Sequence, residues 1–291
     1  MISVVIASYK EPRTIGKAIK VLAPQLTKED EIIVTAPDEA TRKAARAALT
    51  KGVPLVILVD KGKGKPAALN RAIQKAKNPL LLLTDGDVFV SANAVALLKR
   101  HLANARVGIV TGRVIAANAK KTMLGFWAYA LSESFHELRL KKQKKEGIIA
   151  TGYLYLIRKN LFSFIPEDTL ADDAYISHRV LEKGYSIVYE PHAEVYVKYP
   201  TTLPDWLRQK KRTAGRVYQL AKRYHLSKLH SFTQEVSAGV IILKKINSLE
   251  EVFWLMGLFV FKLYVWARVF FDYRLWKRTF SNVWQRVEST K

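Results

Sequence analysis

The chain has 291 residues, 49% of them hydrophobic, which is enough for one large domain or for one domain with a substantial appendage. It contains no cysteine, and this excludes disulfides, a thiol nucleophile and a cysteine-ligated zinc site. The formal net charge of +23 at pH 7 indicates an anionic partner, such as a phosphorylated substrate, an acidic membrane surface or nucleic acid.

The first 115 residues predict an alternation of strands and helices. The predicted strands cover residues 2–7, 31–36, 54–60, 79–85 and 107–114. The helices between them fall within residues 11–26, 39–49, 65–78 and 91–102, and Ser91 is the expected cap of the last one. Each strand is a continuous apolar run, which is typical of a parallel sheet covered by helices on both faces. We therefore expect an α/β fold with a Rossmann-like, mostly parallel sheet.

The strand–helix alternation weakens after residue 115. The predicted elements that follow are an amphipathic helix at 123–140, an exposed basic loop at 141–147, a strand at 149–159, a helix at 172–183 closed by Gly184, a strand at 185–191 and a basic helix at 203–224. We expect residues 1–225 to form one domain on this basis.

The C-terminal region, residues 226–291, contains the most apolar stretches of the chain. Residues 249–271 are long enough to span a bilayer, although Lys262 and Arg268 interrupt them. Tryptophan and tyrosine side chains in this stretch are typical of membrane interfaces. Residues 232–280 are therefore predicted to be membrane-associated helices that either span the bilayer or lie in its plane. The alternative is a buried helix of the soluble domain.

Polar residues follow each of the first four predicted strands. In parallel α/β sheets, ligands bind at the carboxyl ends of the strands, so these residues should lie along one edge. They are Ser8 to Glu11, Pro37 and Asp38, Asp60 and Lys61, and Asp85 to Asp87.

The tripeptide Asp85-Gly86-Asp87 has two interpretations. Asp-Gly between apolar runs is a strong β-hairpin signal. However, the alternating strands and helices around it favour the end of a parallel strand, where acidic side chains face a ligand. Two carboxylates separated by one small residue can both reach Mg²⁺ or Mn²⁺ and its bound diphosphate. Gly86 would let the backbone approach such a ligand closely.

Five motifs in this order resemble those of family 2 glycosyltransferases, which have the GT-A fold. They are ASYKE at 7–11, GKPAALN at 64–70, DGD at 85–87, ADDAYISHRVLEKGY at 171–185 and QKKRT at 209–213. The resemblance covers roughly residues 1–220. The last motif departs from the family pattern Q-x-x-R-W because Thr213 stands where tryptophan is expected, which argues against a processive polymerase.

The resemblance implies transfer of a sugar, with inversion, from a nucleoside-diphosphate sugar. The donor would be held by Ala7, Tyr9, Glu11, Asp38, Lys65, Asp85 and Gly86. Asp87, with Asp85, would bind Mn²⁺ or Mg²⁺. Asp38 departs from the family pattern, because the second strand ends in TAPDEA rather than in a DDGS-like sequence, so the base preference stays open.

The resemblance also implies a catalytic base and an acceptor site. Asp173 aligns with the family base, and the adjacent Asp172 is the alternative. Gln209 and Arg212 lie three residues apart on one helical face and would hold the diphosphate. Thr151 and Gly152 would lie near the acceptor.

The expected partners are therefore a nucleotide-sugar donor, a lipid-linked or glycan acceptor and an anionic membrane surface, with no nucleic acid. The expected location is the cytoplasmic side of the cell membrane. Two alternatives stay open. A sugar-nucleotide pyrophosphorylase-like enzyme would need a glycine-rich, arginine-containing loop, which ASYKEPRTIG does not supply. A non-enzymatic basic protein that binds nucleic acid or membrane fits the charge but not the acidic strand ends.

Overall fold

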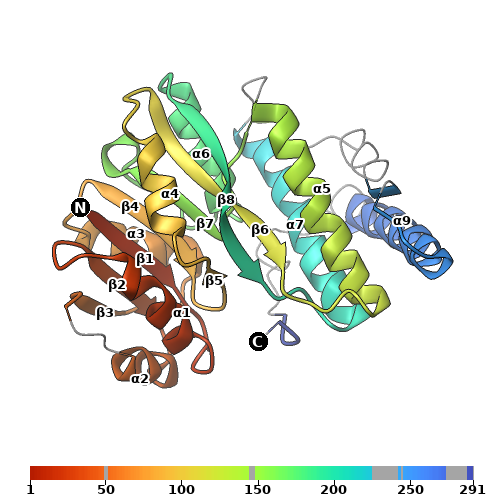
Figure 1. The fold of residues 1–291 in the computed structure, drawn as a ribbon, viewed down its shortest axis with the longest axis horizontal. Coiled ribbons are helices and arrows are strands. Elements are labelled where there is room, and N and C mark those ends of the chain that lie inside the picture. Colours follow the sequence, from red (N-terminus) through yellow and green to blue (C-terminus); the bar gives the residue numbers. More distant parts are fainter. Residues whose placement is uncertain (49–51, 144–147, 225–241, 244, 273–286, 291) are drawn as a thin grey trace. The chain divides into compact units, whose positions relative to one another are not determined.

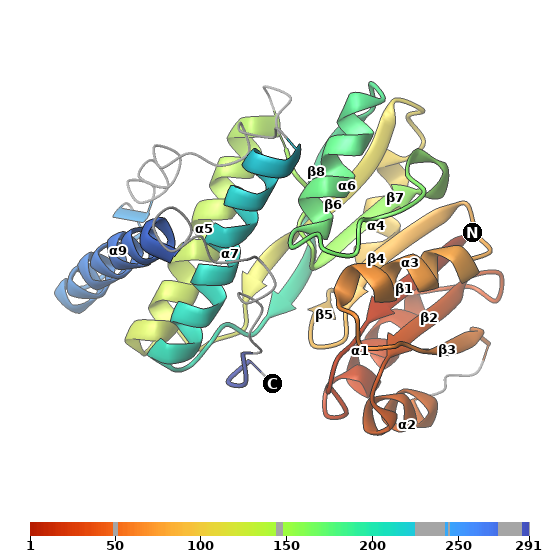
Figure 2. The same ribbon diagram turned by 180° about the vertical axis from the view of Figure 1, so that it is seen from behind.

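The computed structural model divides the chain into two compact units (Figures 1 and 2). The first comprises residues 1–115 and 139–197, and the second comprises 116–138 and 198–291. Each unit is described by itself. The residues that the structure describes are 1–48, 52–143, 148–224, 242–243, 245–272 and 287–290.

One sheet organises the first unit, in the strand order β3-β2-β1-β4-β7-β6-β8-β5. The strands are β1 (Ile2–Ala7), β2 (Glu31–Ala36), β3 (Leu55–Val59), β4 (Leu80–Asp85), β5 (Phe89–Val90), β6 (Val107–Ala116), β7 (Leu154–Arg158) and β8 (Ser186–Val197). β1 pairs in parallel with β2 and β4, and β2 pairs in parallel with β3. The continuous apolar runs of β1, β2 and β4 are buried, as expected for strands covered on both faces.

Helices cover both faces of this sheet. They are α1 (Ile15–Leu22), α2 (Glu39–Ala47), α3 (Lys65–Lys75), α4 (Ala94–His101) and α6 (Asp172–Glu182). α3 and α6 lie on the face turned toward the viewer in Figure 2, and α1 and α4 lie on the face seen in Figure 1. The first turns of α3 and α6 therefore belong to the same face of the sheet.

The predicted α/β class is confirmed, and the sheet is mixed: β1, β2, β3 and β4 pair in parallel, whereas β5 pairs with β8 in the antiparallel sense. β7 lies between β4 and β6 and runs antiparallel to both. Ser91 does not cap α4, which begins at Ala94 after Asn93. Ser91 instead exchanges hydrogen bonds with Glu194, next to the short β5–β8 pairing that the sequence did not predict.

Three long helices form most of the second unit: α5 (Met123–Gln143), α7 (Leu203–Tyr224) and α9 (Leu249–Phe270). Trp127 of α5 joins them. Its indole Nε1 donates to the carbonyl oxygen of Trp254 at 2.7 Å, and its ring meets that of Trp206 edge-on, with centroids 5.8 Å apart. Lys120 also forms an ion pair with Glu251 at 2.8 Å.

α9 is long and apolar enough to cross a membrane, and it is the one such helix among the described residues. One side packs on α5 and α7, whereas the opposite side exposes large apolar side chains, including Phe253, Val260 and Phe270. Residues 225–241 and 273–286 lie outside the described residues, and they include much of the region predicted to associate with membranes. The predicted division at residue 225 therefore stays a prediction.

Candidate active site

An acidic cluster lies at the carboxyl end of the central strands. Ala7 at the end of β1 is directly beside Asp85 at the end of β4. The Nζ atom of Lys65, the first residue of α3, lies 2.7 Å from Asp85 Oδ1 and 3.7 Å from Asp172 Oδ2 at the start of α6. Residues from distant segments thus meet at one point. Asp85 lies at the carboxyl edge of the sheet as its place after a strand predicts, and Lys65 and Asp172 join it from the first turns of two helices.

The charges of this cluster depend on one another. Burial alone would lower the pKa of Lys65, but the carboxylates of Asp172 and Asp85 raise it above its ordinary value, so the ammonium stays charged. Burial raises the pKa of Asp85; Lys65 opposes this shift, and the negative charge of Asp87 adds to it. A further positive charge near Asp85 and Asp87 would therefore relieve the excess of carboxylates.

Residue 86 packs so closely against the loop that follows β1 that only glycine, which has no side chain, fits there. A Cβ atom at this position would lie 2.4 Å from Ser8 Oγ and 2.6 Å from Glu11 Oε2. Ser8 Oγ donates to Glu11 Oε2 at 2.7 Å, and both residues are buried. Glu11 therefore supports the turn that carries Asp85 and Asp87, which adds a positioning role to its predicted donor contact.

The loop after β1 is fastened to the start of α2. Asp38 caps α2: its Oδ1 accepts from Thr41 N at 2.9 Å, and its Oδ2 accepts from Lys10 N at 2.8 Å. Thr41 Oγ1 in turn accepts from Glu11 N at 2.8 Å. Lys10 has a φ of 54°, a conformation that non-glycine residues seldom adopt and that this bonding supports. The contact of Asp38 with a nucleotide base stays a prediction, as does that of the half-exposed Tyr9.

Of the two predicted acceptor residues, Gly152 is in direct contact with the predicted base, whereas Thr151 bonds to β6. Gly152 N donates to Asp173 Oδ2 at 2.9 Å, and Thr151 N donates to Thr111 Oγ1 of β6 at 2.9 Å. Asp173 is partly exposed, whereas Asp172 is only 4% exposed. Of the two adjacent acids, Asp173 is thus the more accessible, and its role as the base stays a prediction.

Gln209 and Arg212 lie on α7 in the second unit. Gln209 is buried, and its backbone carbonyl accepts from Thr213 Oγ1 at 3.0 Å. Gln209 and Arg212 belong to the second unit, whereas the acidic cluster belongs to the first. Their contact with a diphosphate stays a prediction.

The donor atoms present fit a divalent cation that arrives with phosphate groups. Within the described ranges, no group of three histidine or acidic side chains is assembled for a metal ion. Asp85 and Asp87 offer carboxylates on either side of a glycine at the strand end. Mg²⁺ and similar ions are commonly held by one or two carboxylates, with substrate phosphates and water completing the coordination.

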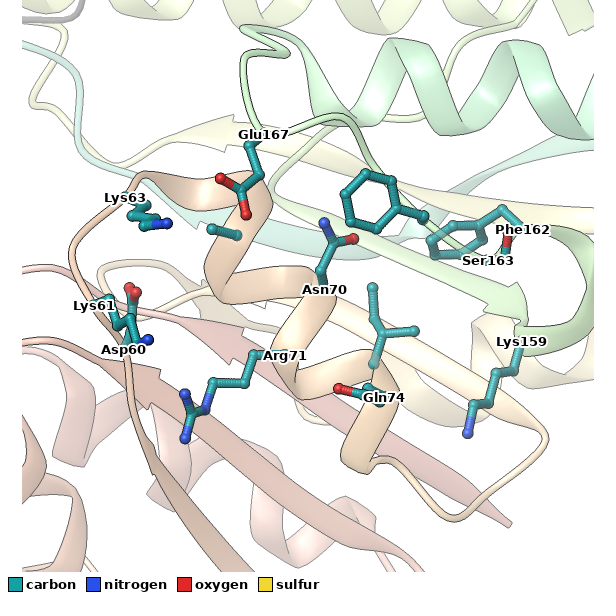
Figure 3. A pocket seen from close by; sticks show the side chains of 13 residues that line it. Asp60, Lys61, Lys63, Asn70, Arg71, Gln74, Lys159, Phe162, Ser163 and Glu167 are labelled. Atoms are coloured by element: carbon teal, nitrogen blue, oxygen red, sulfur yellow. The ribbon is translucent and has the colours of Figure 1, made fainter.

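A separate pocket of about 670 Å³ lies along the outer side of α3 (Figure 3). Its walls are α3 and the segment after β7, joined by the side chain of Asn70, which bonds both backbone groups of Ile165. Lys61, Lys63 and Arg71 contribute positive charge to its lining. Asp60 and Lys61, which follow the third strand and were expected at the ligand edge, line this pocket, whereas Lys65, Asp85 and Asp172 do not.

Tyr155 is a residue of the cluster that the sequence analysis did not single out. It lies on β7, is 1% exposed, and senses the charges of Asp172, Asp173 and Asp85, which add to the effect of burial in raising its pKa well above the ordinary value. The sequence feature that could have pointed to Tyr155 is its hydroxyl group, which is the one polar side-chain group in the otherwise apolar run LYLI. Its position beside the carboxylates depends on the antiparallel register of β7, which that run does not reveal.

Comparison with known proteins identifies the family of this chain. The model of the family described as "Glycosyltransferase like family 2" matches residues 1–215. The chain belongs to this family and is a glycosyltransferase with a GT-A-like fold.

Two curated relatives are consistent with this assignment. The probable glycosyltransferase YdaM of Bacillus subtilis is 30% identical over 168 residues, which are 55% of this chain and 40% of that protein. The poly-beta-1,6-N-acetyl-D-glucosamine synthase of Staphylococcus aureus is 24% identical over 260 residues, which are 87% of this chain and 62% of the synthase. The chain thus spans less than two thirds of the length of both relatives.

Two solved structures share the fold. The mannosyltransferase PcManGT from Pyrobaculum calidifontis, in complex with GDP-Man and Mn²⁺, has a TM-score of 0.62 at 18% identity and covers 97% of this chain and 84% of its own. Glucosyl-3-phosphoglycerate synthase from Mycobacterium tuberculosis, in complex with Mn²⁺, UDP and phosphoglyceric acid, has a TM-score of 0.53 at 14% identity and covers 80% of each chain. These neighbours bind nucleotides together with a divalent metal.

Proposed function

We propose that this glycosyltransferase is a metal-dependent, inverting enzyme that moves a sugar from a nucleoside-diphosphate sugar to a lipid-linked or glycan acceptor at a membrane surface. The observation that carries the proposal is the meeting of Lys65, Asp85 and Asp172 at the carboxyl ends of β1 and β4. The carboxylates of this cluster can bind a divalent metal ion, and the Lys65 ammonium can bind a phosphate oxygen. Binding of a metal-bound diphosphate requires both.

Asp85 and Asp87 would hold Mn²⁺ or Mg²⁺, and this ion would neutralise the charge of the departing nucleoside diphosphate. Lys65 lies beside Asp85 and would bind a diphosphate oxygen with a charge-assisted hydrogen bond. Gly86 leaves room for the loop after β1, where Ala7, Tyr9 and Glu11 would contact the nucleoside. Mn²⁺ in the complexes of PcManGT and of glucosyl-3-phosphoglycerate synthase supports the choice of ion.

Asp173 would act as the general base. Its carboxylate would take the proton of the acceptor hydroxyl as that oxygen attacks the anomeric carbon. Its greater exposure compared with Asp172 and its hydrogen bond from Gly152 N support this assignment. Asp172, which is buried and lies near Lys65, would keep the start of α6 in place.

The acceptor would approach past Thr151 and Gly152, and Gln209 and Arg212 would bind the diphosphate from α7. The exposed apolar side of α9 and the net charge of +23 support an anionic membrane as a partner. We place the enzyme on the cytoplasmic side of this membrane. Bilayers expose anionic headgroups to such basic proteins, so an acceptor carried in the bilayer would be concentrated near the site.

Sugar transfer by single-residue variants tests this function. Asp87→Ala and Asp173→Asn should each reduce transfer to a membrane-extracted acceptor at least a hundredfold, because one removes a metal ligand and the other removes the base. Arg71→Gln is the matched control: it changes a charge on the same face of the sheet, in the pocket of Figure 3, and should leave transfer unchanged. Turnover like that of the wild type in both acidic variants would contradict the proposal.

A further inference from the structure

Two buried polar atoms near the acidic cluster make no hydrogen bond. Among the described residues, neither the Tyr155 hydroxyl nor Asp172 Oδ2 has a hydrogen-bond partner. Tyr155 is 1% exposed and Asp172 is 4% exposed. Buried polar groups without partners are rare because they reduce stability, so two of them in one active site call for a function in another state of the protein.

The sheet register brings these groups to one place. Tyr155 of β7 is directly opposite Leu83 of β4, so its side chain is on the same face of the sheet as Asp85, two residues further along β4. Asp172 reaches this face from the start of α6, since its Oδ2 is 3.7 Å from Lys65 Nζ. The carboxylates of Asp172, Asp173 and Asp85, together with burial, raise the pKa of Tyr155, so its hydroxyl keeps its proton and can donate it.

Lys65 is the charged partner of both carboxylates in the structure, at 2.7 Å from Asp85 and 3.7 Å from Asp172. A diphosphate bound at the proposed donor site would attract the Lys65 ammonium away from the more distant Asp172. Asp172 would then be a buried carboxylate without a cation, which is strongly unfavourable. A hydrogen-bond donor is needed at that moment. The Tyr155 hydroxyl is buried on the same face of the sheet, and Asp172 is the carboxylate with the largest charge effect on it.

We propose that Tyr155 is a positioning residue that donates its hydroxyl hydrogen to Asp172 when Lys65 engages the donor diphosphate. The bond would hold the first turn of α6, and with it Asp173, in place while the donor is bound. Tyr155 would therefore act through Asp172 and would not touch the reacting atoms. This inference rests on the proposed function, because it requires a diphosphate-containing donor.

The variant Tyr155→Phe tests the inference, since it removes only the hydroxyl. The free protein should unfold at the same temperature as the wild type or at a higher one, because a buried unsatisfied group is lost. Affinity for GDP or UDP with Mn²⁺, measured by calorimetry, should fall about tenfold or more, as expected for a lost hydrogen bond to a charged group. KM for the nucleotide sugar should rise accordingly. Tyr189→Phe, at another buried tyrosine of the same unit, is the control and should leave affinity and KM unchanged.

Two results would overturn the inference. Unchanged nucleotide affinity and KM in Tyr155→Phe would show that the hydroxyl has no role in the bound state. A fall in the unfolding temperature of the free variant, matched by the loss of affinity, would show a merely structural role. Failure of the proposed function would give a different result, because the wild-type protein itself would then turn over no nucleotide sugar. If only this inference fails, the wild-type protein turns over its donor and Tyr155→Phe binds the nucleotide as tightly as the wild type.

Discussion

Replacing Gly86 by alanine should destabilise the protein and weaken donor binding together. The new Cβ would lie 2.4 Å from Ser8 Oγ, 2.8 Å from Ser8 Cβ and 2.6 Å from Glu11 Oε2. Ser8 and Glu11 are buried and hydrogen-bonded to each other, so neither can turn aside without breaking that bond. The turn that carries Asp85 and Asp87 must therefore shift.

The expected cost follows from the overlap. Extra atoms forced into a packed site typically destabilise a protein by about 1–3 kcal/mol. For a folded unit of about 150–250 residues, each kcal/mol lowers the melting temperature by roughly 2–4 °C. The displaced turn should also weaken the binding of Mn²⁺ and nucleotide at least tenfold, because small displacements of positioning groups have large effects on function.

Thermal unfolding and calorimetric titration of Mn²⁺–nucleotide measure both effects. Gly16→Ala is the control. The Cβ would lie 3.6 Å from the nearest atoms, Ala44 O and Ala48 Cβ, and Gly16 is in α1, where alanine is favoured over glycine. The double variant Ser8→Gly with Gly86→Ala removes two of the three close contacts, and should lose less stability than the sum of the single changes. A Gly86→Ala protein with the stability and nucleotide affinity of the wild type would refute the packing argument.

Three further predictions concern other parts of the chain. Lys65→Met should lower nucleotide affinity at least tenfold in calorimetry, because it leaves Asp85 and Asp172 without their shared cation; an unchanged affinity would contradict this. Glu190→Gln should cost about 1–3 kcal/mol at pH 7 in urea unfolding, since Glu190 is buried and accepts bonds from Arg100 and His101. Burial alone would raise the pKa of Glu190, but the bonds from His101, the backbone of His192 and Arg100 lower it below the ordinary value of 4.5. The stabilisation is therefore present above pH 4.5 and is lost as the pH falls through the folded pKa, so a penalty that does not shrink as the pH is lowered below 4.5 would count against it. Phe253→Glu, on the exposed side of α9, should shift the protein from anionic vesicles to the supernatant in co-sedimentation while its melting temperature stays unchanged.

Much of the first unit could be predicted from local patterns. The runs ISVVIA and EIIVTA are apolar throughout, and such runs are typical of strands covered on both faces, as β1 and β2 are. The strand ends then predicted that Asp85 would lie at the carboxyl edge of the sheet, beside the end of β1. The ion pair of Asp85 with Lys65 was not predicted. The direction of β7 was not predictable in this way, because LYLIR presents the same apolar run in a parallel and in an antiparallel strand.

Local capping and buried polar contacts were harder to predict. Ser91 has a good capping residue type, but its hydrogen bonds go to Glu194, 103 residues away. Asp38 was expected at the nucleotide, and the structure shows its oxygens bonded to Thr41 and Lys10. Such partners are decided by tertiary contacts that no local window contains. The same holds for Tyr155, whose neighbours come from β4 and α6.

Binding of nucleotide sugars with and without Mn²⁺ tests the central claim most directly. GDP-mannose, UDP-glucose and UDP-N-acetylglucosamine would be titrated one at a time, with the melting temperature as the readout. A ligand that binds only the native state raises this temperature in proportion to its affinity and concentration. We predict a rise with at least one donor that requires Mn²⁺ and disappears in Asp87→Ala. No rise with any donor, or an equal rise without the metal, would contradict the account.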